Sequence, residues 1–344
     1  MYSFGVNGER KTIVVNDGAR VTSAETGRSL LFGLMSDGTF IPSACGGKGS
    51  CGQCRAFIKG GALPYTPAEN SLLSESDRRV GVHLCCQVTV LGDLSIQIPW
   101  KNLSARQYKA RVAGLRELTG EIKEITLEVK GGISFAAGQY VQIFLPGTES
   151  LPEPQYRAYS MASAPSSPER LAFMVRREPA GVVSPYLCDK LQQGQELAIR
   201  GPFGDFRLHE SRRALLFVAG GSGLAPIRSM LLTMAEQAKA GLTSRPATLY
   251  FSGRTRKDLF LMEELSALEA QLPFRFVPLL SNPSPDERWD GERGGMPAVL
   301  NRRLDRMDNH EAYLCGSTGM IDACIKVLRG KGLPEELLFF DKFL

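Results

Sequence analysis

Four cysteines have the types and spacing of an iron–sulfur ligand set. Cys45, Cys51 and Cys54 follow the pattern C-x5-C-x2-C inside the glycine-rich stretch CGGKGSCGQC, and Cys86 comes later in the chain. Three thiolates on one tight loop and a fourth from a later strand can hold a [2Fe-2S] cluster. Glycines permit the positive φ angles and close backbone approach that such a loop needs, so that N–H groups point at the sulfurs. Because the cluster carries single electrons, this pattern predicts an electron-transfer protein.

A zinc site and a disulfide pair are the alternatives for these cysteines. Zinc ribbons present two short C-x2-C knuckles, whereas here only Cys51 and Cys54 form one. Residues 1–20 lack the basic and apolar regions of a signal peptide, so the expected compartment is a reducing cytoplasm, where disulfides are rare. The fourth ligand stays open, because Cys85 and Cys86 are neighbours that point to opposite faces if they lie on a strand.

The composition describes a globular protein of two or three domains. The chain has 344 residues, of which 43% are hydrophobic and 22% charged. Its net charge of +5 is spread along the chain, which argues against a nucleic-acid partner. No stretch approaches eighteen consecutive apolar residues, so we expect no membrane-spanning segment.

Patterns of apolar residues divide the chain into three predicted domains. Residues 1–101 predict a small α+β domain, residues 106–210 an antiparallel barrel, and residues 212–344 a parallel sheet covered by helices. The expected strands of the first domain are 11–15, 56–59, 88–90 and 94–98, with a helix at 29–37. Those of the barrel are 108–117, 122–129, 139–144, 157–161, 171–175 and 196–200. In the third domain strands at 214–219, 248–252, 274–280, 312–314 and 337–340 alternate with helices at 227–239, 260–270, 298–304 and 320–328.

A glycine loop between a strand and a helix predicts a dinucleotide site. Gly221, Ser222, Gly223 and Pro226 lie in the stretch GGSGLAP, which follows the apolar strand 214–219. There the N–H groups of the first helical turn can meet a pyrophosphate, and the glycines let the backbone approach it. Pro226 departs from the G-x-G-x-x-G pattern, and a plain strand-to-helix turn is the alternative, since proline starts a helix without losing a bond.

Three other short motifs could contact cofactors. Arg157-Ala158-Tyr159-Ser160 offers a cation for phosphate, a ring for a flat heterocycle and a hydroxyl for its edge, although plain strand alternation explains it equally. Gly181-Val182-Val183-Ser184 can form a second phosphate cradle at a helix start, with a bare turn as the alternative. Cys315-Gly316 follows a strand at the carboxyl end where open parallel sheets bind ligands, so the thiol can flank a nicotinamide or simply pack.

The order of these motifs resembles a plant-type ferredoxin domain fused to a reductase of the ferredoxin-NADP reductase superfamily. This resemblance implies a β-grasp ferredoxin domain, an antiparallel FAD barrel and an α/β NAD domain, and it covers nearly the whole chain. Within the superfamily the chain is most similar to the F subunits of sodium-translocating NADH:quinone reductases. The supporting stretches are residues 45–55, Cys86-Gln87-Val88, residues 157–162, Gly201-Pro202-Phe203-Gly204 and the ending Asp341-Lys342-Phe343.

The resemblance implies roles for individual residues. Cys86 is implied as the fourth ligand because it precedes Gln-Val. Arg157 is implied to hold the FAD pyrophosphate, Tyr159 to lie against the isoalloxazine, and Ser160 to bond near flavin N5. The segment from Val182 to Ser184 is implied to complete the phosphate site.

At the nicotinamide end, residues 221–226 are implied to cradle the NADH pyrophosphate. Cys315 is implied to flank nicotinamide C4, and Phe343 to cover the flavin face until nicotinamide displaces it. The family's Cys-Gly-Pro-Pro-Met is replaced here by Cys-Gly-Ser-Thr-Gly-Met. After the strand 248–252, Arg254 and the following basic residues hint at a 2′-phosphate and hence NADPH, but the nearest family shares them while using NADH.

We therefore expect NADH to reduce FAD, FAD to pass single electrons to the [2Fe-2S] cluster, and the cluster to serve a partner protein such as an oxygenase component. NADPH is the alternative donor. A reductase for a quinone or a corrinoid protein is one alternative function, and an iron–sulfur redox sensor that does not turn over is another. The F subunits of the sodium pumps begin with a transmembrane helix, whereas this chain begins directly with the ferredoxin-like segment, which argues against a place in such a pump.

Overall fold

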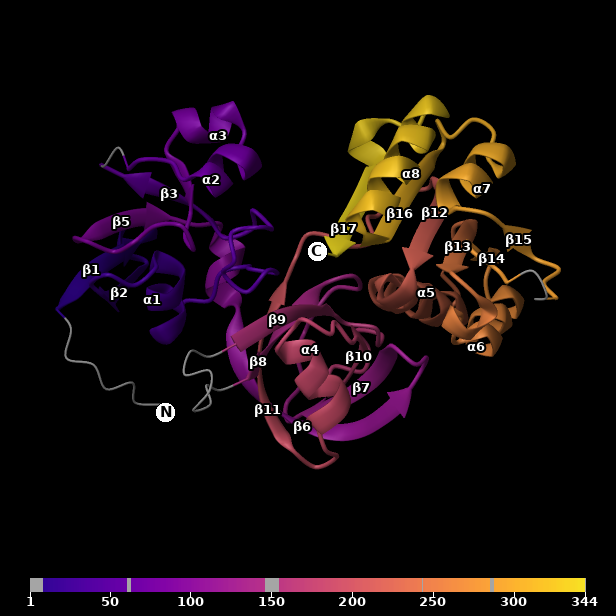
Figure 1. The fold of residues 1–344 in the computed structure, drawn as a ribbon, viewed down its shortest axis with the longest axis horizontal. Helices are drawn as coiled ribbons and strands as arrows, with labels where there is room; N and C mark the ends of the chain where they lie inside the picture. Colours follow the sequence, from indigo (N-terminus) through magenta and orange to yellow (C-terminus); the bar gives the residue numbers. More distant parts are fainter. Residues whose placement is uncertain (1–8, 61–62, 146–154, 243, 285–287, 344) are drawn as a thin grey trace. The chain divides into compact units, whose positions relative to one another are not determined.

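The computed structural model describes residues 9–60, 63–145, 155–242, 244–284 and 288–343. These residues form three sheets, one in each of the three predicted segments (Figure 1). Contacts divide the chain into two compact units: Met1–Tyr108 with Gln142–Ala158 and Ala198–Phe203, and Lys109–Val141 with Tyr159–Leu197 and Gly204–Leu344. Among the described residues, none of the helices has both the length and the apolar character required to cross a bilayer.

The first sheet has five strands in the order β2-β1-β5-β3-β4, with β1 antiparallel to β2 and parallel to β5. Helix α1 (Leu30–Ser36) begins where the Ser29 side chain accepts a hydrogen bond from the N–H of Phe32, and it buries Leu30 and Leu34. This arrangement confirms the predicted β-grasp domain. The strands are β1 (Arg10–Val15), β2 (Arg20–Glu25), β3 (Arg55–Lys59), β4 (Val82–Leu84) and β5 (Leu94–Gln97).

Two features of this domain differ from the prediction. Helices α2 (Pro67–Leu72) and α3 (Glu75–Arg79) were not predicted, although each begins with a capping box, Thr66 with Glu69 and Ser74 with Asp77. The strand predicted at 88–90 is wrong, since that segment has only an isolated bridge between Ser29 and Thr89. The stretch that leads into the second domain contains a 3₁₀ turn at Trp100–Ser104.

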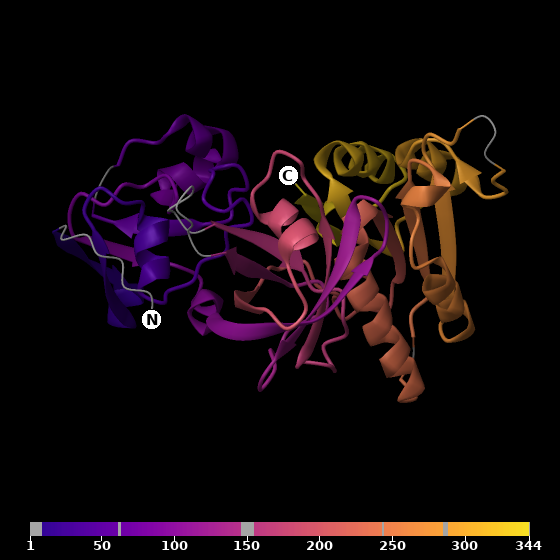
Figure 2. The same cartoon turned by 60° about the horizontal axis from the view of Figure 1, so that its bottom comes forward.

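The second sheet has six strands in the order β10-β7-β6-β11-β8-β9. A bridge between Met161 and Phe173 joins the end of β9 to β10, so the sheet curls round as the predicted antiparallel barrel (Figure 2). A single helical turn, α4 (Val183–Pro185), and a π turn at Tyr186–Lys190 precede its last strand. The strands are β6 (Arg106–Glu117), β7 (Ile122–Val129), β8 (Tyr140–Leu145), β9 (Gln155–Ser160), β10 (Arg170–Arg176) and β11 (Glu196–Phe203).

The third sheet is parallel throughout, in the order β15-β14-β13-β12-β16-β17, as predicted. Helices α5 and α6 cover one face, and α7 and α8 cover the other (Figure 1), each over its own buried apolar cluster. The strands are β12 (Ala214–Gly220), β13 (Ala247–Gly253), β14 (Phe274–Leu280), β15 (Glu292–Arg293), β16 (His310–Ser317) and β17 (Leu338–Phe343). The helices are α5 (Leu224–Lys239), α6 (Met262–Ala267), α7 (Met296–Arg303) and α8 (Thr318–Gly330).

Candidate functional site: a thiol loop and the carboxyl edge of a parallel sheet

The cysteines of the predicted cluster site lie in two pairs. The sulfurs of Cys45 and Cys51 are 3.4 Å apart, and the Cys51 thiol lowers the pKa of Cys45 to about 4 by hydrogen bonding. Cys54 and Cys86 form the second pair, in which a hydrogen bond lowers the pKa of Cys86 to about 7. In each pair, therefore, the deprotonated form of one of the two thiols is favoured. A [2Fe-2S] cluster has two irons with two thiolate ligands each, so this donor set fits it.

The loop between these cysteines needs its glycines. Gly46, Gly47, Gly49 and Gly52 all have φ between 66° and 84°, the left-handed region that side chains disfavour. These turns allow the loop to bring Cys45 and Cys51 within 3.4 Å of each other.

Cys85 and Cys86 lie in a turn after β4 and not on a strand. Cys85 is fully buried, and its backbone N–H donates to the carbonyl oxygen of Cys54 at 2.7 Å. Burial raises the pKa of its thiol. Cys86 is half-buried and lies beside Cys54. This geometry supports Cys86 as the fourth ligand, although the residue's role stays a prediction.

A buried carboxylate fixes the backbone that leads to this turn. Glu69 is 1% exposed and accepts hydrogen bonds from the N–H groups of Leu84 (2.9 Å) and Thr66 (2.9 Å). The Thr66 hydroxyl also donates to it at 3.1 Å, and Nδ1 of His83 lies 3.0 Å away. The sequence pattern did not reveal this support, because residues 69 and 83–84 meet only when α2 packs beside β4.

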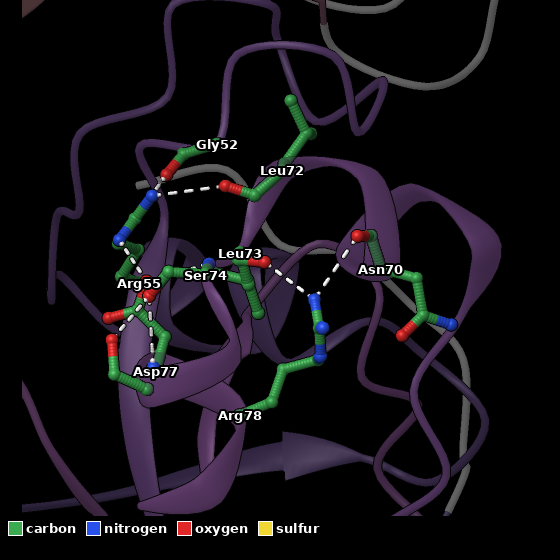
Figure 3. Close-up of polar contacts among 9 residues, drawn as sticks. Gly52, Arg55, Asn70, Leu72, Leu73, Ser74, Asp77 and Arg78 are labelled. Atoms are coloured by element: carbon green, nitrogen blue, oxygen red, sulfur yellow. Dashed lines mark hydrogen bonds and ion pairs between the residues drawn. The ribbon is translucent and has the colours of Figure 1, made fainter.

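Arg55, the residue after Cys54, ties the cluster loop to helices α2 and α3 (Figure 3). Its guanidinium donates to the carbonyl oxygens of Gly52 (2.9 Å) and Leu72 (3.2 Å) and pairs with Asp77 at 2.9 Å. The Gly52 carbonyl is thereby held on the outside of the loop. A second arginine, Arg78, donates to the carbonyl oxygens of Leu73 (2.6 Å) and Asn70 (3.1 Å), as Figure 3 also shows.

Strand β9 carries the three predicted flavin contacts. Arg157 folds back, and its Nη1 donates to the carbonyl oxygen of Tyr156 at 2.7 Å. Tyr159 is half-buried and Ser160 is buried. Side chains alternate along a strand, so Arg157 and Tyr159 share one face and Ser160 points to the other.

The predicted phosphate cradle at 181–184 is a tight turn. The Ser184 hydroxyl accepts a hydrogen bond from the N–H of Glu178 at 3.0 Å, and a Cβ at Gly181 would lie 3.1 Å from the Glu178 carbonyl oxygen. Val182 is 42% exposed at the tip of the turn. The helix that follows, α4, is only one turn long.

The predicted NADH loop joins β12 to α5. Gly221 has φ of 54°, and an added Cβ there would meet only Ile122 at 3.8 Å, which leaves its outer side open. Ser222 and Pro226 are buried, and α5 begins at Leu224, earlier than predicted. Its first turn therefore directly follows the glycines, as a helix-start pyrophosphate site requires.

Cys315 and Gly223 are packed against each other. A Cβ at Gly223 would lie 2.3 Å from the carbonyl oxygen of Cys315. The Cys315 side chain is fully buried, and strand β16 continues past it to Ser317. At Gly316, with φ of 151°, an added Cβ would meet the methyl group of Met320 at 2.7 Å. The glycine loop and the predicted nicotinamide strand thus meet without a gap.

Asp341 was given no role in the sequence analysis, yet it joins two predicted residues. On β17 it is the register neighbour of Cys315, and its carboxylate interacts with the side chain of Ser160 of the barrel. Burial raises the pKa of Asp341 to about 6, and the interaction with Ser160 partly opposes this shift. Only the three-dimensional pairing of residues 160, 315 and 341 reveals this group, since nothing in their local sequence links them.

The last strand also positions Phe343, whose carbonyl oxygen accepts a hydrogen bond from the Thr318 hydroxyl at 3.4 Å. Its ring packs against the apolar cluster under α5 and α6. Arg254 lies beyond the end of β13 and is exposed. The roles proposed for both residues stay predictions.

Comparison with known protein families matches three successive domains. Residues 7–91 match the 2Fe-2S iron-sulfur cluster binding domain, residues 111–208 the oxidoreductase FAD-binding domain, and residues 217–326 the oxidoreductase NAD-binding domain. The chain is therefore an NAD(P)H-dependent oxidoreductase with a [2Fe-2S] domain fused to a ferredoxin reductase module, and its cofactors are a [2Fe-2S] cluster, FAD and NAD(P)H.

Similar proteins identify the family within this class. The F subunit of the Na(+)-translocating NADH-quinone reductase from Neisseria gonorrhoeae is 32% identical over 96% of this chain and 91% of that protein. The corresponding protein of Klebsiella pneumoniae is 31% identical over 95% and 90%. The chain belongs to this family.

Two solved structures are similar to nearly the whole chain. The cytochrome P450 reductase GcoB of Amycolatopsis has a TM-score of 0.77 and 26% identity, covering 97% of this chain and 98% of that one. A ferredoxin reductase of carbazole 1,9a-dioxygenase has a TM-score of 0.75 and 26% identity, covering 98% and 99%.

Proposed function

We propose that this chain takes electrons from NADH and delivers them through FAD and the [2Fe-2S] cluster to a partner protein, such as an oxygenase component. The observation that carries the proposal is the meeting of Ser160, Cys315 and Asp341. It brings a barrel strand implied in flavin binding to the carboxyl edge of the nucleotide-binding sheet. A nicotinamide bound at this sheet edge and a flavin bound at the barrel strand would therefore be neighbours.

The residues present fit both nucleotide cofactors. The open outer side of Gly221 and the first turn of α5 would hold the NADH pyrophosphate, while Arg157 and the turn at 181–184 would hold that of FAD. Ser160 would orient the flavin edge by its hydroxyl, and Cys315 would pack beside the nicotinamide. Bound FAD would accept a hydride from NADH and give up its two electrons one at a time with loss of one proton. The cluster would take each electron singly, with one ferric ion becoming ferrous, and would pass it to the acceptor before taking the next.

NADH is the proposed donor, with NADPH as the rival. The exposed Arg254 follows β13, where an arginine can accommodate a 2′-phosphate. Against this, the similar sodium-pump proteins are named as NADH-quinone reductases. Comparison of kcat/KM for NADH and NADPH tests which of them is the donor. A strong preference for NADPH would overturn our choice.

The partner is proposed as an electron-accepting protein. The two similar solved structures are named as reductases of a P450 and of a dioxygenase, both of which are oxygenases. The NADH-quinone reductase relatives favour a quinone as the second candidate acceptor.

The decisive experiment is anaerobic titration of the purified protein with NADH. We expect FAD and two irons with two sulfides per chain, bleaching of the flavin band, and the electron paramagnetic resonance signal of a reduced cluster. We also expect steady NADH oxidation with ferricyanide. A redox sensor would bind nucleotide without such turnover, and a colourless protein that holds zinc would refute the proposal.

A further inference from the structure

The segment that leads into the cluster loop is docked on barrel strands by buried polar contacts. Phe40, Ile41 and Ser43 precede Cys45, and their exposed fractions are 7%, 0% and 0%. They contact β8, β9 and β11, and all of these contacting residues belong to the same compact unit.

Arg200 is the central residue of this contact. Its guanidinium carbon lies 4.6 Å from the ring centre of Phe40 and 4.5 Å from that of Phe144, between the docked segment and β8. Its Nε donates to Oε1 of Gln107 at 2.9 Å. Among the residues that the structure describes, no carboxylate pairs with this cation, which is 8% exposed. Two aromatic faces thus take the place of a counter-ion.

Neighbouring hydrogen bonds also join the barrel strands to the segment that precedes the cluster loop. Nε2 of Gln142, a fully buried residue, donates to the carbonyl oxygen of Ile41 at 3.3 Å. The Tyr156 hydroxyl donates to Oγ of Ser43 at 3.4 Å, and the same Oγ accepts a hydrogen bond from the N–H of Gly47. These bonds connect β8 and β9 with the loop that contains the thiols.

Gly46 shows how closely the loop approaches β9. A Cβ at this residue would lie 2.1 Å from Nη1 of Arg157 and 2.7 Å from the carbonyl oxygen of Tyr156. The backbone of the cluster loop therefore rests directly on the strand that carries the predicted flavin contacts.

We propose that Arg200 is a positioning residue that holds the segment 40–46 against the barrel strands, so that electrons pass from the flavin-binding strand to the cluster loop in one fixed arrangement. This inference rests on the proposed function. No bond forms or breaks in these single-electron transfers, so their rate depends strongly on the distance between the two sites, which the placement of the loop sets.

The test compares Arg200→Ala and Arg200→Lys with wild-type holoprotein. Lysine keeps the charge but lacks the planar group that lies between two rings. After rapid mixing with NADH, we expect flavin bleaching within about twofold of wild type but cluster reduction, followed by freeze-quench paramagnetic resonance, about tenfold slower or more in Arg200→Ala. Arg200→Lys should lie between. The control is Arg111→Ala, which removes an exposed barrel arginine paired with Glu128 and should leave both rates within about twofold.

One further measurement needs no electron transfer, and a second needs no variant. Hydrogen exchange in the peptide covering 39–47 should be slow in wild type and faster in Arg200→Ala but not in Arg111→Ala. In wild type, doubling the solvent viscosity should leave the cluster-reduction rate unchanged, because the loop already rests on the strand and has no distance to travel.

Three results would overturn the inference: unchanged cluster reduction in a folded Arg200→Ala protein, unchanged exchange in 39–47, or a wild-type rate that falls in proportion to viscosity. Failure of the proposed function looks different. In that case NADH would fail to reduce the cluster in wild type at all.

Discussion

Replacing Gly223 by alanine tests whether the glycine loop and the nicotinamide strand meet as closely as the structure shows. The backbone of Gly223 has φ of −62° and ψ of −8°, which alanine adopts freely, so any effect must be steric. The new Cβ would lie 2.3 Å from the carbonyl oxygen of Cys315, 2.6 Å from its carbonyl carbon and 2.8 Å from the N of Gly316.

The size of the effect follows from these distances. Ordinary contacts of a Cβ begin at 3.4 Å, so the loop and strand must separate by about 1 Å. All three opposing atoms are backbone and cannot rotate away. Overpacking of this kind costs about 1–3 kcal/mol of stability. A displacement of about 1 Å between donor and acceptor sites lowers a reaction rate by about 10²-fold.

The assay pairs urea unfolding with the rate of flavin reduction by NADH. The control is Gly319→Ala in the first turn of α8, where an added Cβ meets nothing within 4 Å. Because alanine favours helix more than glycine does, that variant should be unchanged or up to about 1 kcal/mol more stable. If Gly223→Ala matched Gly319→Ala in both stability and flavin reduction, the close packing and its role in hydride transfer would both be refuted.

Three shorter predictions follow from the same site. Cys86→Ser should lose the cluster while Cys85→Ser keeps it, as iron and sulfide analysis will show; the reverse result would exchange the two residues' roles. The raised pKa of Asp341, about 6 against the usual 3.8, stabilises the fold fully below pH 3.8, and this contribution, about 3 kcal/mol, is lost as pH rises through 6. Asp341→Asn should remove that pH dependence from unfolding curves, and an unchanged profile would contradict the shift. Arg55→Ala should release iron to a chelator several-fold faster, because the Gly52 carbonyl loses its donor; an unchanged release rate would show that this hydrogen bond does not protect the cluster.

Much of the fold was predictable because its patterns are local. Strand β7 was predicted at 122–129 with its observed bounds, and β14 at 274–280 likewise, since each has a continuous or alternating apolar pattern. Helix α1 was predicted within one residue at each end because Ser29 is a strong cap.

The errors arose where tertiary contacts override local pattern. The apolar residues at 88–90 resemble a strand, but only one bridge forms there, so the cysteines before them lie in a turn. The short helices α2 and α3 have too few apolar residues to show a helical period. Their capping boxes were the available signal.

Individual candidate residues of the site could be proposed from the sequence, but their arrangement could not. The glycines and cysteines could be recognised in the sequence because backbone conformation and metal ligation restrict the residue type. Asp341 and Arg200 could not be recognised in this way, since an aspartate near the chain end or an arginine on a strand is usually a solvated surface charge. Only their neighbours, Ser160 in one case and two aromatic rings in the other, suggest the roles proposed for them.

Strand β9 links the two halves of the proposed electron path through its own geometry. Tyr156 contacts the loop before the cluster, and Ser160, four residues later, contacts Asp341. At about 3.3 Å per residue these two side chains lie about 13 Å apart along one strand, and their even spacing puts them on the same face. A shift of β9 by one residue would turn both to the opposite face. If Tyr156 and Ser160 have the proposed roles, such a shift would therefore be expected to disturb both at once.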